Sequence, residues 1–197
     1  MVHRIPCIGQ CIRLGLLIPA LVCTVAFADD YTPVNDLLRK GQLPEAMTRA
    51  DEYLAKNPRD PQMQFLKALI QQDAGKQADA IASYNRLIEA YPELPEPYNN
   101  VAVLYAGQGQ YDRARAALEM ATRTSRSYAT AYENLGDVYA RLASQSYSQA
   151  QQLEPGNSTI APKLALIRQL FGPPVQTRGT PATDRARPPT PAASTAR

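Results

Sequence analysis

Residues 95–121 read PEPYNNVAVLYAGQGQYDRARAALEMA, and the same classes of residue recur 34 positions before and after them. Glycines, small residues, prolines and tyrosines all follow this one spacing. The series are Gly41, Gly75 and Gly109; Ala46, Ala80 and Ala114; Ala68, Ala102 and Gly136; Pro58 and Pro92; Pro61 and Pro95; Tyr98 and Tyr132; and Tyr105 and Tyr139. A fixed period of this length is typical of proteins in which each repeat is one supersecondary unit.

Each of these residue classes has a physical reason to recur. Two antiparallel helices pack closely where both carry a small residue, and a glycine lets the turn between them adopt a positive φ. Proline cannot continue a helix, so it separates one repeat from the next. The pattern predicts an all-α fold built from helix–turn–helix pairs.

The repeat resembles the tetratricopeptide repeat, whose signature is an aromatic residue, a Leu-Gly or Leu-Ala pair, a tyrosine, a later alanine, an aromatic, another alanine and a closing proline. The matching residues are Ala68, Ala80, Tyr84 and Pro92 in the second repeat; Tyr98, Val101, Ala102, Tyr105, Ala114, Leu118 and Ala121 in the third; and Tyr132, Leu135, Gly136 and Tyr139 in the fourth.

The first repeat keeps only Gly41, Ala46 and Pro58, and its first helix is shortened to about residues 33–40. Terminal repeats are often atypical in this way. The resemblance covers residues 32–171. It implies a right-handed superhelical solenoid of about three to four repeats with a C-terminal capping helix.

The fourth repeat departs from the pattern because its turn is missing. Tyr139 is followed after only eight residues by Tyr147, where the family spacing would need about five more. No glycine or proline lies between Ala140 and Leu153. The sequence therefore predicts one long helix over residues 131–153 instead of a hairpin.

A final helix is expected over residues 160–170, with Thr159 as its N-terminal cap. Its predicted apolar face consists of Leu164, Ile167, Leu170 and Phe171. We expect this helix to cover the end of the solenoid.

The first 28 residues have the pattern of a secretory signal peptide. Basic residues precede an apolar run over residues 14–26, and Ala26-Phe27-Ala28 matches the A-x-A cleavage pattern. The run of about 13 residues is shorter than the roughly 20 that span a bilayer. Cleavage after Ala28 is therefore favoured over an uncleaved membrane anchor.

All three cysteines and the only histidine lie within this N-terminal segment. The rest of the chain therefore offers no disulfide, no thiolate nucleophile, no Cys/His zinc site and no histidine base. Cys23 follows Val22, whereas a lipidated cysteine of bacterial lipoproteins follows a small residue, so lipid attachment is disfavoured. A cysteine-free mature chain fits an oxidising compartment, and we expect the bacterial periplasm.

The C-terminal residues differ in composition from the repeats. Residues 172–197 contain six prolines and one large aliphatic residue, Val175, too little apolar surface to offset chain entropy. The predicted organisation is a signal peptide over residues 1–28, a solenoid over 29–171 and a disordered tail over 172–197. The formal net charge of +3 is too small and too scattered for a nucleic-acid-binding surface.

In tetratricopeptide proteins the first helix of each repeat lines a concave surface that binds peptides or partner helices. By this resemblance, the lining residues are Gln62, Phe65, Leu69, Gln72 and Asp73; Glu96, Asn99, Val103 and Ala106; and Thr130, Glu133, Asp137 and Arg141. Such a mixed polar and apolar lining suits an amphipathic segment. For Phe65 and Leu69, packing against a neighbouring repeat is the competing interpretation.

The basic clamp with which some family members hold acidic C-termini is not matched, because Phe65 and Leu69 stand at its positions. The six tyrosines at signature positions are predicted to pack in the core rather than to form a stacking surface; they are Tyr84, Tyr98, Tyr105, Tyr132, Tyr139 and Tyr147.

The predicted function is a periplasmic adaptor or chaperone-like scaffold, without catalysis or cofactor, that holds a peptide or helix of a protein partner. We do not expect the protein to bind nucleic acid. We also do not expect it to insert stably into a membrane after cleavage of the signal peptide. Two alternatives remain: a homo-oligomerisation module built on residues 131–171, and a non-catalytic subunit of an envelope assembly complex. An enzyme would have to use carboxylates such as Asp73, Glu133 and Asp137, for which an ordinary charged surface is the simpler interpretation.

Overall fold

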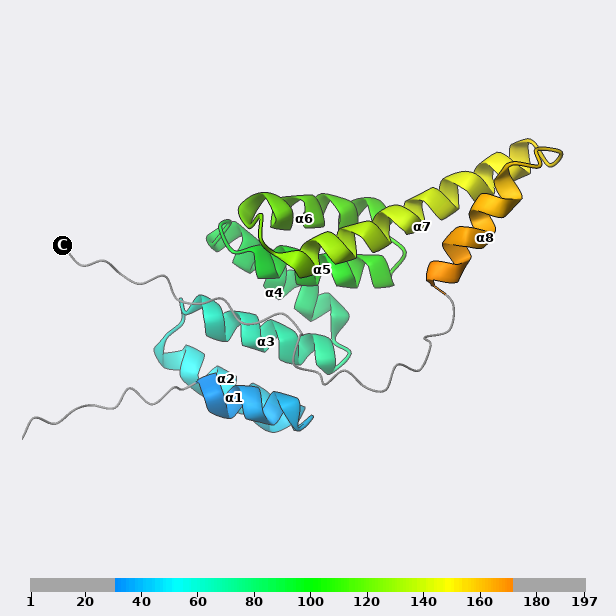
Figure 1. Ribbon diagram of the computed structural model, residues 1–197. Helices are drawn as coiled ribbons and strands as arrows, with labels where there is room; N and C mark the ends of the chain where they lie inside the picture. Colours follow the sequence, from blue (N-terminus) through cyan, green and yellow to red (C-terminus); the bar gives the residue numbers. More distant parts are fainter. Residues whose placement is uncertain (1–30, 172–197) are drawn as a thin grey trace, which may run out of the picture.

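The computed structural model describes residues 31–171, and within them eight α-helices follow one another without a strand (Figure 1). The helices are α1 (Tyr31–Arg39), α2 (Leu43–Lys56), α3 (Pro61–Asp73), α4 (Gln77–Ala90), α5 (Pro95–Gly107), α6 (Tyr111–Thr124), α7 (Ala129–Leu153) and α8 (Ile160–Leu170). The all-α helix-pair solenoid is confirmed. The predicted signal peptide and C-terminal tail lie outside the described residues.

The turn inside each of the first three repeats is made by a glycine. Gly41, Gly75 and Gly109 have φ values of 71°, 73° and 72°. Residues other than glycine rarely adopt this backbone conformation. After α5, the backbone amide of Gln110 donates to the carbonyl of Tyr105 at 2.9 Å, which closes the helix end in a Schellman-type turn. The period of the glycines is therefore the period of the turns.

Small residues mark the places where the helices cross. Ala46, Ala68, Ala80, Ala102 and Ala114 are each 0% exposed. They belong to two hydrophobic clusters, one under α1–α3 and one extending from α3 to α7. Because an alanine leaves room for a close helix approach, the alanines of the predicted small-residue series are confirmed as interhelical packing. Gly136, the last member of the series, is exposed and has no neighbour within 4 Å of its Cβ position.

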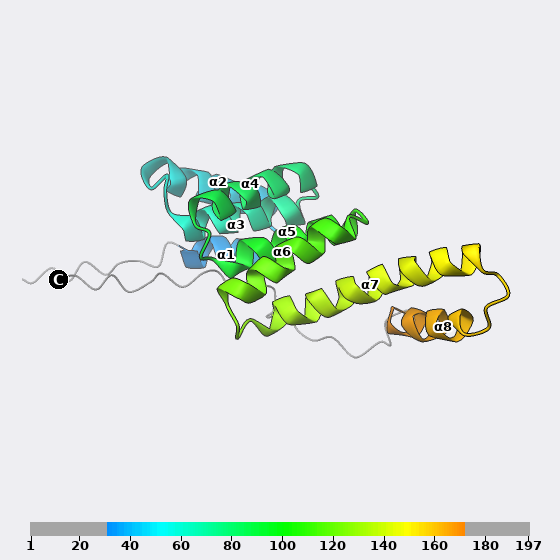
Figure 2. The same cartoon turned by 90° about the horizontal axis from the view of Figure 1, so that it is seen from above.

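Helix α7 is continuous over 25 residues, as the missing turn predicts. Its first half packs against α5 and α6. Its second half extends beyond the stack of α1–α6, and among the described helices α8 alone lies beside it in both views (Figures 1 and 2). None of the helices in residues 31–171 has the length and hydropathy needed to cross a membrane.

The bounds predicted for α8 are confirmed, but its apolar face differs from the expectation. Ile160 and Leu164 are buried against α7, whereas Leu170 is 71% exposed. Thr159 stands at the N-cap position without capping, because its hydroxyl donates to Asn157 Oδ1 at 2.7 Å. The helix therefore packs along the second half of α7 and does not cover the end of the solenoid.

The tyrosines of the fourth repeat are a second correction. Tyr84, Tyr98 and Tyr105 are buried as predicted, but Tyr132 and Tyr139 are 48% and 47% exposed. The physical reason is the missing turn, because no second helix of the same repeat folds back over this face of α7.

Candidate binding surface

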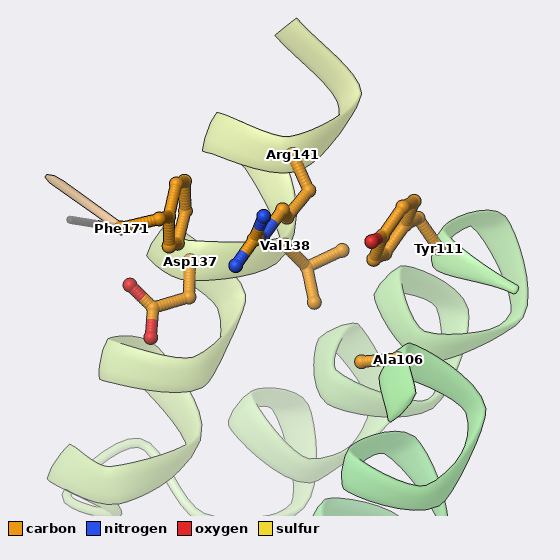
Figure 3. Close-up of a pocket in the computed structure, with 6 residues that line it drawn as sticks. All are labelled: Ala106, Tyr111, Asp137, Val138, Arg141 and Phe171. Carbon is orange, nitrogen blue, oxygen red and sulfur yellow. The ribbon is translucent and has the colours of Figure 1, made fainter. Parts of the chain in front are cut away.

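A pocket of about 330 Å³ opens where the end of α5, the start of α6, the middle of α7 and the end of α8 meet (Figure 3). Val138 is buried beside it, and the rings of Tyr111 and Phe171 are half-buried. The lining residues are Ala106, Tyr111, Asp137, Val138, Arg141 and Phe171. The pocket thus combines apolar walls with two charged side chains.

The charged side chains come from one face of α7. Asp137 and Arg141 are four residues apart, so they project from the same side of the helix. The Arg141 guanidinium lies 3.6 Å from the centre of the Phe171 ring, and Figure 3 shows the two side chains next to each other. This cation–π contact joins the residue after α8 to the middle of α7 and leaves both charged groups exposed.

Three residues that the resemblance assigned to the concave surface therefore come together: Ala106, Asp137 and Arg141. Val103 lies one turn before Ala106 on α5 and is 43% exposed, and exposed Glu133 lies one turn before Asp137 on α7. We call this set of five residues the α5–α7 surface. The side chain of Asn134 donates to Asn99 Oδ1 at 2.8 Å and ties the two helices together.

Asn99 itself is not available to a partner, because it is 3% exposed and its amide oxygen is occupied by Asn134. Its assignment to the binding surface was wrong. Position 99 instead contributes by fixing α5 against α7.

Phe65 also has to be removed from the predicted surface. It is 0% exposed, and its ring centroid lies 5.8 Å from that of Tyr84 on α4. Leu69 is half-buried and packs against both hydrophobic clusters. The competing interpretation, core packing, is therefore the right one for Phe65, and the repeat spacing could not distinguish the two.

The rest of the predicted α3 lining is polar. Gln72 is half-buried and accepts a hydrogen bond from the Tyr84 hydroxyl at 3.2 Å. Asp73 is exposed at the end of α3. Because Phe65 is buried, α3 presents much less apolar surface than the sequence suggested.

Gln62 and Glu96 occupy matching places in the first turns of α3 and α5. Gln62 Oε1 and Glu96 Oε2 are both shielded from solvent and have no hydrogen-bond partner among the described residues. Burial raises the pKa of the Glu96 carboxyl above its ordinary value, since a low-dielectric setting penalises the charged form.

Sequence reasoning missed three residues of the pocket: Tyr111, Val138 and Phe171. Tyr111 has Gln77 and Leu43 at the matching places in the preceding repeats, so no repeat signature marks it. Phe171 follows the last helix and reaches Arg141 only because α8 packs antiparallel to α7 (Figure 2). That long-range contact left no local pattern.

The α5–α7 surface and the pocket beside it combine charged, apolar and aromatic groups. Within residues 31–171, no three His, Cys, Asp or Glu side chains are grouped closely enough to hold a metal ion. An amphipathic segment bound here would contact charged and apolar groups together. These are the carboxylates of Glu133 and Asp137, the Arg141 guanidinium, exposed Val103 and the rings of Tyr111 and Phe171.

Comparison with known proteins agrees with the fold. One tetratricopeptide repeat family model matches residues 31–95 and 102–152, and a second tetratricopeptide repeat model matches residues 83–116. The chain is 30% identical over 76 residues to the chloroplastic tetratricopeptide repeat protein PYG7 of Arabidopsis thaliana, covering 36% of this chain and 25% of that protein. It is 30% identical over 99 residues to the photosystem I assembly protein Ycf3 of Cyanophora paradoxa, covering 50% and 55%. The chain thus spans only part of the length of both relatives.

Solved structures show the same arrangement of helices. MamA superposes with a TM-score of 0.52 at 21% identity, covering 71% of this chain and 84% of that one. A thermophilic tetratricopeptide repeat protein of Thermus thermophilus superposes with a TM-score of 0.54 at 24% identity, covering 73% and 81%. The family models span more than half of the sequence, and the chain belongs to the tetratricopeptide repeat family.

Proposed function

We propose that the protein is a periplasmic adaptor that holds a peptide or helix of a partner protein on the α5–α7 surface. The observation that carries the proposal is the pocket beside exposed Val103, because it joins Asp137 and Arg141 to apolar walls. Tetratricopeptide repeats form scaffolds for protein–protein interaction. One relative, Ycf3, is named as an assembly protein, which is consistent with such a role.

The partner that fits this surface is amphipathic. An apolar side chain would enter between Tyr111 and Arg141, whose guanidinium stacks on the Phe171 ring (Figure 3). Cationic groups of the partner would lie near Glu133 and Asp137. Arg141, one turn along α7 from Asp137, would bind an acidic group of the partner. Because stacked helices fix these side chains before binding, little ordering entropy is lost by the scaffold.

The test is affinity capture from the cell-envelope fraction with matched surface variants. Val103→Lys places a charge on the exposed surface of α5 and should reduce the amount of captured partner at least 10-fold. Ala82→Lys places the same charge on exposed α4 surface and should retain it. Equal capture by both variants, at unchanged helicity, would remove the α5–α7 surface from the proposal.

Export is part of the same proposal and has its own test. The A-x-A pattern ending at Ala28 supports a mature chain that begins at Asp29. The intact mass of protein recovered from the periplasmic fraction should correspond to residues 29–197. Recovery of uncleaved protein from the cytoplasmic fraction would contradict the proposed compartment without affecting the binding surface.

A further inference from the structure

One face of α7 lacks the cover that the same face of α5 has. Tyr132, Gly136 and Tyr139 form this open face of α7. The matching residues of α5, which are Tyr98, Ala102 and Tyr105, are 7%, 0% and 6% exposed, whereas Tyr132 and Tyr139 are 48% and 47% exposed. A Cβ added at Gly136 would meet nothing within 4 Å.

The cover of α5 is the second helix of its own repeat. Helix α6 brings Ala114, Leu118 and Ala121 against the core, and these residues are 0%, 1% and 0% exposed. The fourth repeat has the corresponding residues in Ala143, Tyr147 and Ala150. They lie further along the same side of the continuous α7, beyond the open face (Figures 1 and 2). All three are half-buried, and the Lys163 side chain of α8 lies 5.3 Å from the centre of the Tyr147 ring, so α8 borders this stripe.

We propose that two copies of the chain complete each other's fourth repeat. In this dimer the second half of each α7 packs antiparallel on the open face of the other α7. The register of the third repeat then places Gly136 against Ala143 of the second copy, and Tyr132 against Tyr147 of the second copy. The same register relates the two copies by a two-fold axis beside Tyr139 and Ala140.

The chain itself indicates that the occupant is a second copy. A second copy carries the residues of the missing second helix at the spacing that the open face requires. Residues 142–153 carry no charged side chain, so no like charges oppose the pairing. A connection too short to reverse the chain favours exchange of an element between copies.

The geometry provides two equivalent contacts in each dimer. Each α7 contributes an open face and a covering half, so the contact is isologous. A helix of 25 residues is about 37 Å long, which gives both halves room to pair. The pocket with Asp137 and Arg141 uses other residues of α7, so dimerisation and partner capture can be tested separately.

The direct test restores the missing turn. A copy of residues 107–111 (GQGQY), inserted between Ala140 and Arg141 of the full chain, should let the second half of α7 fold back within its own chain. Light scattering after size exclusion should give a dimer for the unchanged protein and half that mass for the variant. The same five residues inserted between Pro155 and Gly156, an exposed connection, should leave the dimer intact.

A monomeric unchanged protein at micromolar concentration overturns the proposal. So does a dimer that survives the insertion after Ala140 with native helicity. Capture of the α5–α7 partner is a separate measurement, and its failure would leave the dimer result standing.

Cysteine pairing tests the register. Gly136→Cys with Ala143→Cys places two thiols seven residues apart on one helix, about 10 Å along its axis, beyond the Cα separation a disulfide allows. Oxidation should therefore give a disulfide-linked dimer on a non-reducing gel, at least 5-fold above either single variant. The unchanged chain sets the background from Cys7, Cys11 and Cys23. No excess over the single variants, or a covalent link to a different protein, overturns the proposal.

Discussion

Gly109 has a residue-scale role that packing does not explain. A Cβ built there meets no atom within 4 Å, yet the backbone has a φ of 72°. The positive φ alone therefore requires glycine at this turn. The same holds for Gly41 and Gly75, so the repeat spacing reports backbone conformation.

Gly109→Val should destabilise the fold by about 1–2 kcal/mol, because a β-branched side chain resists the left-handed region. Urea denaturation measures this change. Gly107→Ala is the matched control, since Gly107 ends α5 without a positive φ and has open space at its Cβ. Unchanged stability of the valine variant would contradict the assigned turn.

Phe65→Ala tests the corrected position of this ring. Because Phe65 is fully buried against Tyr84, the variant should lose about 3–5 kcal/mol of unfolding free energy. Val103→Ala, at a half-exposed site on α5, should lose less than about 1 kcal/mol. Equal stability of the two variants in chemical denaturation would return Phe65 to the binding surface.

The burial of Glu96 predicts that the stability of a Glu96→Gln variant, relative to the unchanged protein, depends on pH. Burial raises the pKa of the Glu96 carboxyl in the folded protein, so folding favours the neutral form of this side chain. The stability that this neutral form contributes is fully present below the ordinary pKa of about 4.3 and is lost as pH rises through the folded pKa. Glu96→Gln should therefore have a higher Tm than the unchanged protein at pH 7, and the difference should shrink towards pH 4. A difference that grows on acidification would contradict the assigned burial.

At the scale of elements, the sequence predicted the helix pairs well because each depends on local signals. Glycine ends α5, proline begins α3 and α5, and small residues repeat at the crossings. The continuous α7 was predicted for the same reason, since the absence of turn residues is visible in the sequence. The bounds predicted for α1, α7 and α8 agree with the structure within about two residues.

What the sequence could not predict depends on contacts between distant elements. The pocket needs Phe171 beside Arg141, which results from the packing of α8 on α7. Repeat spacing placed Phe65 on the surface, whereas the neighbouring Tyr84 buries it. Tyr132 and Tyr139 match core positions of the repeat, but they are exposed because the fourth repeat has no turn and no second helix folds back over them.

The attachment of α8 to α7 gives an element-scale prediction with a control on the same helix. Leu164 is 2% exposed and Leu166 is 64% exposed. Leu164→Ala should cost about 2–3 kcal/mol of local stability and raise amide hydrogen exchange throughout α8. Leu166→Ala should leave that exchange nearly unchanged, and similar exchange in the two variants would contradict the packing described for α8.

At the scale of the whole molecule, the irregular fourth repeat leaves α7 with two separate faces, and each of the two proposals uses one of them. Asp137 and Arg141 lie on its pocket side, and Tyr132 and Tyr139 on its open face. The first three repeats form a supporting stack, and the hydrogen bond from Asn134 to Asn99 fixes α7 of the fourth repeat against α5 of the third. Partner capture and self-association therefore do not compete for the same residues.

The central claim, capture of a partner on the α5–α7 surface, is tested most directly by photo-crosslinking in living cells. A photoreactive residue at Val103 should link the protein to one or a few partners, whereas the same residue at Ala82, on exposed α4 surface, should not. Asp137→Lys should reduce the links formed at position 103. Identical crosslinked species from both positions, insensitive to Asp137→Lys, would contradict the account.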